Sequence, residues 1–98
     1  MNKLTGNGSG RVLVVDDEPD MRRLLARLLV KKGGYDVLEA DSGGVGLVIA
    51  REWLPDVVLT DVKMPGIDGV EFFRRLKEID PTMSTIIMTG YGTVEMAV

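Results

Sequence analysis

A chain of 98 residues, 45% hydrophobic and 28% charged, is large enough for one small globular domain. Its net charge of −3, without a Lys/Arg-rich stretch, argues against direct binding to nucleic acid or to an anionic membrane surface. The chain has no Cys and no His, which excludes disulfides, thiolate or imidazole metal sites and catalysis by His or Cys, so any chemistry must depend on carboxylates, hydroxyls and lysines.

The first ten residues differ in composition from the rest of the chain. Met1 to Gly10 are rich in Gly, Asn and Ser and show no apolar periodicity, so we expect a flexible leader before one domain that covers Arg11 to Val98. The leader lacks the apolar stretch of a secretory signal, and the apolar runs of the chain are too short to span a membrane. We therefore expect a cytoplasmic protein.

The first part of the domain predicts a strand, a helix and a second strand. The strands are the apolar run Val12–Val15 and the segment Tyr35–Ala40. Between them, Pro19 stands near the start of a helix and Gly33 near its end. Apolar residues recur at helical spacing in this stretch: Met21, Leu24, Leu25, Leu28 and Leu29.

The next part predicts a second helix and a third strand. Ser42 to Trp53 is bounded by a capping-type serine and by Pro55, although three glycines lower its helix propensity: Gly43, Gly44 and Gly46. We assign a helix here on topology more than on propensity. The third strand is predicted at Asp56–Thr60.

The last part predicts a third helix, a fourth strand and the start of a fourth helix. Asp68 and Glu71 form a start that resembles a capping box, and the helix runs on to Ile79 and stops before Pro81. The strand is Thr85–Met88, and we expect a helix to begin at Thr93. Strands that alternate with helices in this way predict an α/β fold with a doubly wound parallel sheet.

Polar residues follow three of the predicted strands. Asp16 and Asp17 come after the first, Asp61 after the third, and Thr89 with Gly90 after the fourth. The carboxyl ends of parallel strands share one edge of a sheet, where the functional crevice of such folds lies. We therefore expect three carboxylates and a hydroxyl to converge there.

Each of these residues also has an ordinary structural explanation. The Asp pair could form a solvated turn or cap a helix, Asp61 could simply end a strand, and Thr89 could open a turn. Three carboxylates gathered together would repel one another, however, and a hard cation that prefers oxygen ligands would offset that repulsion. Mg²⁺ fits this description best.

A cation beside a carboxylate suits phosphoryl transfer, because the metal neutralises charge on the phosphoryl oxygens while the carboxylate attacks in line. Asp61 would be the nucleophile. Gly90 would allow a backbone N–H to approach the phosphoryl group, and the Thr89 hydroxyl could donate to it.

Three motifs resemble the receiver domain family of two-component response regulators: VLVVDDEPDMRRLL, LTDVKMPGIDGVEF and IIMTGYGTVEMAV. The resemblance covers Arg11 to Val98 and implies a flavodoxin-like receiver fold. It also implies that Asp61 is the phosphoacceptor, Asp17 a direct magnesium ligand, Asp16 a ligand through water, and Lys63 the donor of a backbone carbonyl to the metal, while Thr89 is the switch hydroxyl.

The same resemblance implies a signalling role. The phosphoryl donor would be a phosphohistidine on a sensor histidine kinase, and the chain would be a switch rather than an enzyme, with at most weak self-phosphorylation and self-dephosphorylation. The ending TGYGTVEMAV is most similar to receivers attached to enhancer-dependent transcription activators.

The chain departs from the family pattern after its fourth strand. The resemblance leads us to expect a completed fourth helix, a fifth strand followed by a Lys, and a fifth helix, none of which the sequence contains before Val98. We therefore expect an incomplete fold in which the strand Thr85–Met88 is an uncovered edge, and a homodimer that forms through this region. It stays open whether the chain is a natural or engineered fragment, or whether the remainder is merely missing from the sequence.

Two other functions remain as alternatives. A magnesium-dependent phosphatase or phosphotransferase usually has a second acid two residues after its Asp nucleophile, where this chain has Lys63, which disfavours that class. A receiver-like module that is not phosphorylated and acts only by protein contact is the second alternative. Magnesium affinity and phosphorylation of Asp61 would distinguish it from a working receiver.

Overall fold

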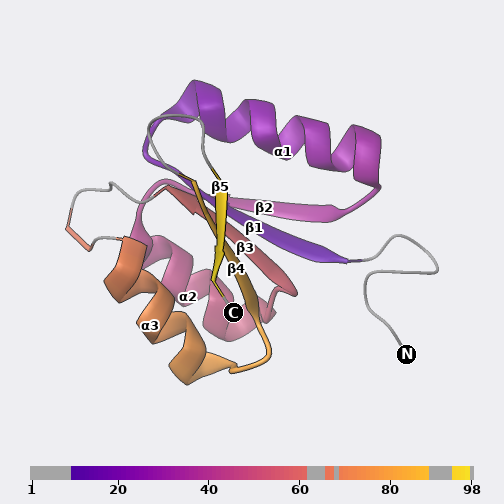
Figure 1. The fold of residues 1–98 in the computed structure, drawn as a ribbon. Coiled ribbons are helices and arrows are strands. Elements are labelled where there is room, and N and C mark those ends of the chain that lie inside the picture. The colour runs from indigo at the N-terminus through magenta and orange to yellow at the C-terminus, as the bar shows by residue number, and fades with distance from the viewer. Residues whose placement is uncertain (1–9, 62–65, 68, 89–93, 98) are drawn as a thin grey trace.

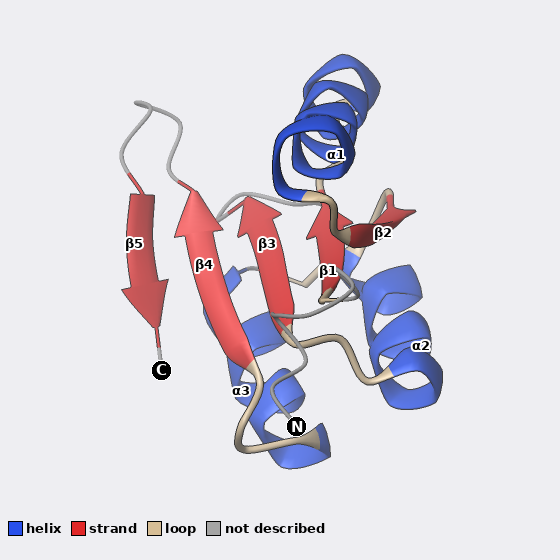
Figure 2. Ribbon diagram, turned by 90° about the vertical axis from the view of Figure 1, so that its right-hand side faces the viewer, coloured by secondary structure: helices blue, strands red, loops and turns tan. Residues whose placement is uncertain are grey.

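The computed structural model describes residues 10–61, 66–67, 69–88 and 94–97 of the 98-residue chain. In this part of the chain the elements are, in order, β1 (Arg11–Val15), α1 (Pro19–Gly33), β2 (Asp36–Ala40), α2 (Gly43–Trp53), β3 (Val57–Asp61), α3 (Gly69–Ile79), β4 (Ser84–Met88) and β5 (Val94–Ala97). The strands form one sheet in the order β2-β1-β3-β4-β5, with β1 to β4 parallel (Figure 2). Helix α1 covers one face of the sheet and α2 and α3 cover the other (Figure 1). The predicted doubly wound α/β architecture is confirmed.

The main core lies between the sheet and the pair α2 and α3. Its buried residues come from β1, β2, β3, α2, α3 and the loop before β4: Leu13, Val15, Ala40, Leu47, Ala50, Val58, Phe72, Leu76 and Met83. Burying a large apolar side chain stabilises a fold by roughly 1.5–3 kcal/mol, so this cluster anchors the sheet to both helices. On the opposite face α1 packs mainly over β1 and β2, and the only residue of this helix that is buried is Ala26.

Helix α1 begins and ends where the sequence predicts. The Glu18 side chain caps it by accepting a hydrogen bond from the Asp20 backbone N–H, and Pro19 occupies the first turn, where no N–H is needed. Lys32 in the last turn is favourably placed at the negative end of the helix dipole. Gly34, with φ of 67°, takes the left-handed conformation that closes many helices.

The glycines of α2 allow it to pack closely against its neighbours. A Cβ on Gly46 would lie 3.0 Å from Phe72 Cζ and 3.1 Å from Val15 Cγ2, and one on Gly43 would collide with the Ile67 side chain. The low helix propensity of this segment is therefore offset by contacts that only glycine permits. Ser42 caps the helix by accepting a hydrogen bond from Val45 N–H at 3.2 Å.

Helix α3 buries Phe72 and Leu76 and ends at Ile79, as predicted. Asp68 of the predicted capping box lies outside the described residues. The side chain of Glu71 forms ion pairs along the outer surface of the helix with Arg74 and Arg75.

The C-terminal segment differs from the prediction. Where we predicted the start of a fourth helix, the described residues Val94–Ala97 form the strand β5 instead. This strand runs antiparallel to β4, with Met88 opposite Val94 and Thr85 opposite Ala97. The prediction that β4 is an uncovered edge is therefore wrong as well. The unpaired N–H and C=O groups that β4 would present on this side find partners in β5, which is the physical reason for the pairing. In the described part of the chain there is no parallel fifth strand and no fifth helix.

One face of the sheet remains partly open. Alternation along the strands places Val58 and its register partner Thr85 toward the core, so Leu59, Ile86 and Met88 point to the face that carries α1. These three side chains are only half-buried because α1 lies over β1 and β2. Among the helices described here, none is both long and apolar enough to cross a bilayer.

Candidate functional site

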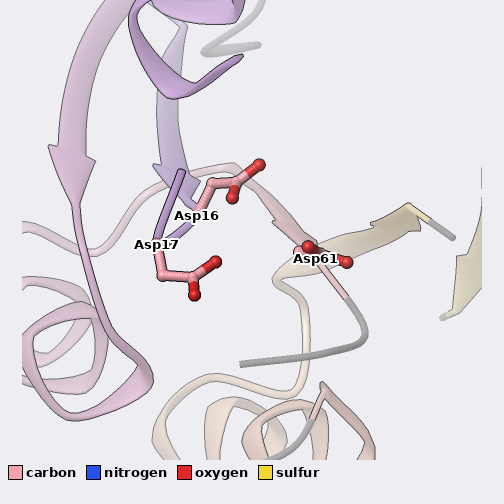
Figure 3. Close-up of side chains that lie close together, drawn as sticks. All are labelled: Asp16, Asp17 and Asp61. Carbon is pink, nitrogen blue, oxygen red and sulfur yellow. The ribbon is translucent and has the colours of Figure 1, made fainter. Parts of the chain in front are cut away.

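Three carboxylates meet at the carboxyl edge of the sheet, as predicted. Asp16 and Asp17 follow β1 directly, and Asp61 is the last residue of the neighbouring parallel strand β3. A carboxylate oxygen from each residue lies within 4.8 Å of one from each of the others. Figure 3 shows the three side chains side by side where the two strands end. The parallel register of β1 and β3 therefore builds the cluster from residues more than forty positions apart in the chain.

Asp16 is held from several sides. It is 4% exposed, and its backbone N–H donates to the Ala40 carbonyl at 3.1 Å. Its carboxylate accepts a hydrogen bond from Glu18 N–H at 2.9 Å, and its own backbone carbonyl accepts one from Arg22 Nη1 at 2.9 Å. These bonds fix the loop between β1 and α1, so the direction of the Asp16 side chain is set by the fold.

The environment of Asp16 raises the pKa of its carboxyl group above the ordinary value of 3.8. The largest cause is burial, which disfavours the charged form, and the negative charges of Asp61, Asp17 and Glu18 add to it. The hydrogen bond from Glu18 N–H acts in the opposite direction but does not outweigh them. Burial and the neighbouring carboxylates therefore both disfavour the ionised form of Asp16.

Among the described residues, the basic side chain bound to this loop is that of Arg22, and its bonds go to groups other than the three carboxylates. Arg22 directs Nη1 to the backbone carbonyl of Asp16 and pairs through Nε with Glu39 at 3.1 Å. A cluster of carboxylate oxygens fits a hard divalent cation such as Mg²⁺, which binds through a few carboxylates and keeps several waters. The donor set and the raised pKa of Asp16 thus agree with a magnesium site.

Asp61 is half-buried at the end of a well-packed strand. Its neighbour Thr60 is fully buried, and the Thr60 hydroxyl donates to the backbone carbonyl of Asp61 at 3.1 Å. In the sheet, Asp61 lies opposite Met88 of β4. The backbone that carries the Asp61 carboxylate is therefore supported on both sides, by β1 and by β4.

Three of the predicted site residues lie outside the described residues: Lys63, Thr89 and Gly90. The structure brings together the other three, Asp16, Asp17 and Asp61. Sequence reasoning missed Arg22, which links the acidic loop to β2 through Glu39. Its position one turn into α1, six residues after Asp16, was the available signal, because a long side chain there can reach back to the loop.

A doubly wound sheet with carboxylates at its carboxyl edge agrees with the receiver class of domains, which are phosphoacceptor signalling domains and not classical enzymes. The chain matches the response regulator receiver domain model over residues 12–98, so it belongs to the response regulator receiver domain family. Receiver domains bind Mg²⁺ at an acidic pocket, and this chain has the corresponding cluster of carboxylates.

Comparison with individual proteins agrees with this assignment. The chain is 42% identical to sporulation initiation phosphotransferase F of Bacillus subtilis over 86 residues, which are 88% of this chain and 68% of that protein. It is 36% identical to the transcriptional regulatory protein GlrR of Escherichia coli over 87 residues, which are 89% of this chain but 19% of that much longer protein.

Solved structures give the same result for the fold. The receiver domain from the hybrid histidine kinase CckA matches with a TM-score of 0.77 and 41% identity, over 86% of this chain and 79% of that one. A chain in the crystal structure of histidine kinase ThkA in complex with response regulator protein TrrA matches with a TM-score of 0.78 and 34% identity, over 86% and 72% of the two chains.

Proposed function

We propose that this receiver domain accepts a phosphoryl group on Asp61 from a phosphohistidine of a sensor histidine kinase, in a reaction that depends on Mg²⁺, and that it then changes conformation to control an output. The observation that carries the proposal is the convergence of three carboxylates within 4.8 Å at the carboxyl edge of the sheet. Burying the ionised carboxylate of Asp16, whose pKa is raised, lowers the stability of the metal-free fold. A functional cation site explains why a carboxylate is placed there nonetheless.

The proposed metal ligands are Asp17 and Asp61 directly, Asp16 through water, and the backbone carbonyl of Lys63. When bound there, Mg²⁺ supplies positive charge that neutralises the oxygens of the incoming phosphoryl group. Asp61 is the nucleophile by its place in the receiver-like motif LTDVKMPGIDGVEF, and the pairing of β3 with β1 and β4 holds its backbone in position. Asp16 and Asp17 keep the site anionic enough to hold the cation.

In the proposed reaction, a carboxylate oxygen of Asp61 attacks the phosphorus atom in line with the leaving group. A bond forms between this oxygen and phosphorus while the bond from phosphorus to the imidazole nitrogen of the donor breaks. The imidazole nitrogen keeps the electron pair and takes up a proton from solvent. The product is an acyl phosphate, and the Thr89 hydroxyl and the Gly90 backbone N–H are proposed to donate hydrogen bonds to it.

The output is proposed to be a shift in population between two states of the segment that follows β4. The relatives support this role by their names, since they include a phosphotransferase, transcriptional regulatory proteins and a complex of a histidine kinase with a response regulator. A cytoplasmic location and control of transcription are parts of the same proposal and rest on these family relations.

The test is the intact mass of the protein after incubation with a small phosphodonor such as acetyl phosphate. A gain of one phosphoryl group that needs Mg²⁺ and is lost in Asp61→Asn is the expected result. The matched control is Asp36→Asn, which removes the same charge at an exposed position at the start of β2 and should be phosphorylated normally. Absence of any mass gain in a folded, magnesium-loaded sample would contradict the proposal.

The second candidate is a module that is not phosphorylated and acts by contact with a second copy of the chain. It is favoured by apolar side chains along one side of α1, Met21, Leu24 and Leu28, which are about half exposed, and by the half-buried Ile86 and Met88 on the same side of the sheet. The contact surface would then be this face of the β4 region, since the edge of β4 is paired with β5. Sedimentation velocity at several concentrations tests it, and a monomer throughout would exclude it.

A further inference from the structure

A groove lies between the C-terminal ends of α2 and α3. It has a volume of about 670 Å³, and its lining comes from the last turn of α2, the residue after α2 and the last two turns of α3: Arg51, Leu54, Arg74, Arg75, Glu78 and Ile79. The chain passes from this end of α2 to the start of β3, whereas Asp61 is at the other end of that strand. The groove is therefore at the opposite end of the sheet from the three carboxylates, and Figure 1 shows α2 and α3 lying next to each other below the sheet.

Two of the groove arginines are held in place by carboxylates of their own helix. Arg74 donates to Glu71 through Nε at 3.1 Å and to Glu78 through Nη1 at 3.3 Å, and Arg75 donates to Glu71 through Nε at 3.0 Å. The hydrogen bonds from Arg74 and Arg75 lower the pKa of Glu71 to about 2, so this anchor stays ionised at any physiological pH. All three nitrogens of Arg74 already donate, Nε and Nη2 to Glu71 and Nη1 to Glu78. Among the described residues Arg75 donates only through Nε, so its two terminal nitrogens can meet a carboxylate in a planar, bidentate manner.

Arg51 is different, because it pairs with no carboxylate in the described part of the chain. Its place in the last turn of α2 suits a cation, yet its charge has no partner there. Counting Glu71, which pairs with Arg74 and Arg75, three arginines stand against two glutamates, so the groove carries a net charge of about +1 in a chain whose total charge is −3. Ion pairs within α3 account for the positions of the Arg74 and Arg75 side chains. They do not account for the presence of Arg51, from another helix, in the same groove.

Leu54 is the second unusual feature of the groove. Its backbone is left-handed, with φ of 51° and ψ of 67°, and its N–H donates to the Ala50 carbonyl at 3.0 Å to close α2. Glycine or asparagine would serve this capping role with less strain. The leucine instead leaves an apolar side chain 44% exposed next to the arginines, and strained residues of this kind gather at binding sites.

We propose that this groove binds an acidic segment of a partner protein. Carboxylates of the segment meet Arg51 and Arg75, and an apolar side chain of the same segment packs on Leu54 and Ile79. Charge complementarity selects an acidic partner, and the exposed leucine selects a polypeptide over a simple anion. A nucleic acid fits less well, because a long polyanion would extend past the groove onto a protein of net charge −3. The site is independent of Asp61.

The experiment uses the full chain labelled with ¹⁵N and two short peptides with blocked ends, one of alternating Glu-Glu-Leu units and one of Gln-Gln-Leu units. The acidic peptide is expected to shift the backbone signals of Arg51, Leu54 and Arg75, with an affinity that falls as salt is added. The neutral peptide should bind about tenfold more weakly or not at all, because it lacks the charge-assisted hydrogen bonds.

Three variants separate the contributions. Arg51→Gln combined with Arg75→Gln should weaken binding of the acidic peptide about tenfold, and Leu54→Asn, which keeps the left-handed cap, should weaken it several-fold. Arg27→Gln on the exposed surface of α1 is the matched control and should leave the affinity unchanged. Asp61→Asn should also bind normally, so failure of the phosphorylation test and failure of this one are distinguishable.

Several results would overturn the proposal. They are the absence of signal shifts at the groove, equal binding of the two peptides, and an unchanged affinity in the folded double arginine variant. Inorganic phosphate or a short duplex DNA that shifts the same signals at equal or lower concentration would also overturn it, because the groove would then be a general anion site.

Discussion

Replacing Asp16 by Asn should stabilise the metal-free protein at neutral pH. The asparagine oxygen can still accept the hydrogen bond from Glu18 N–H, so the change removes charge but little structure. Carboxylate oxygens of Asp16 and of each neighbouring Asp lie at most 4.8 Å apart. At 4.8 Å, two like charges repel by about 0.9 kcal/mol in bulk water and by about 3.5 kcal/mol at an effective dielectric constant of 20. Because Asp17 is exposed and Asp61 half-buried, we expect a total gain of about 1–3 kcal/mol.

This gain should depend on pH in a defined direction. Burial and its acidic neighbours raise the pKa of Asp16 in the folded state above 3.8, so the folded state holds this proton more tightly than the unfolded state does. The contribution of Asp16 to stability is therefore complete below the unfolded pKa and is lost as the pH rises through the folded pKa. Asp16→Asn should accordingly exceed the natural chain in stability at pH 7 and lose that advantage below pH 3.8.

The assay is urea unfolding followed by circular dichroism at several pH values, with and without Mg²⁺. A cation that binds only the folded state at a hundred times its Kd adds about 2.7 kcal/mol, so Mg²⁺ should stabilise the natural chain more than the variant. Asp36→Asn, which removes an exposed charge far from the cluster, should change little. A variant less stable than the natural chain at pH 7 without metal, or a gain that persists at pH 3, would refute the reasoning.

The glycines of α2 and one threonine of β4 supply three further predictions, each measured by thermal unfolding, where 1 kcal/mol corresponds to a shift of about 4–8 °C in a domain of this size. Gly46→Ala should destabilise by about 1–2 kcal/mol, because its Cβ would meet the fully buried Phe72 at 3.0 Å and Val15 at 3.1 Å, which outweighs the gain in helix propensity. Gly44→Ala, on the exposed side with no atom within 4 Å, should instead stabilise by about 1 kcal/mol, and a loss of stability there would contradict this account. Thr85→Val should stabilise by about 1–2 kcal/mol, because the buried Thr85 hydroxyl has no hydrogen-bond partner among the described residues; a destabilised variant would point to a hidden partner.

Much of the fold follows from local sequence patterns. The apolar spacing in α1 and the continuous runs in β1, β3 and β4 predicted their elements. The apolar residues of the strand runs are buried or half-buried, whereas Met21, Leu24 and Leu28 of α1 keep the helical spacing although they are about half exposed. The three carboxylates could also be predicted to meet, since parallel neighbouring strands must end at the same edge.

Other features depend on packing or pairing that no single segment reveals. Gly43 and Gly46 weakened the prediction of α2, and only the closeness of Ile67, Phe72 and Val15 shows why they are there. The segment Val94–Ala97 fits a short strand as readily as the start of a helix, and its pairing with β4 decides the outcome. The groove at Arg51 and Leu54 could not be anticipated either, because it joins residues from two helices that are separate in sequence.

The acidic cluster and the arginine-lined groove lie at opposite ends of the strands and carry charge of opposite sign. Such a distribution contributes an electric dipole that runs along the sheet, so the molecule presents different potentials to its surroundings at its two ends. A cationic ligand and an acidic polypeptide are thereby drawn toward different ends before either makes contact, and this orienting effect fades as ionic strength rises. Because the length of the sheet separates the two ends, both can be occupied at once without steric conflict.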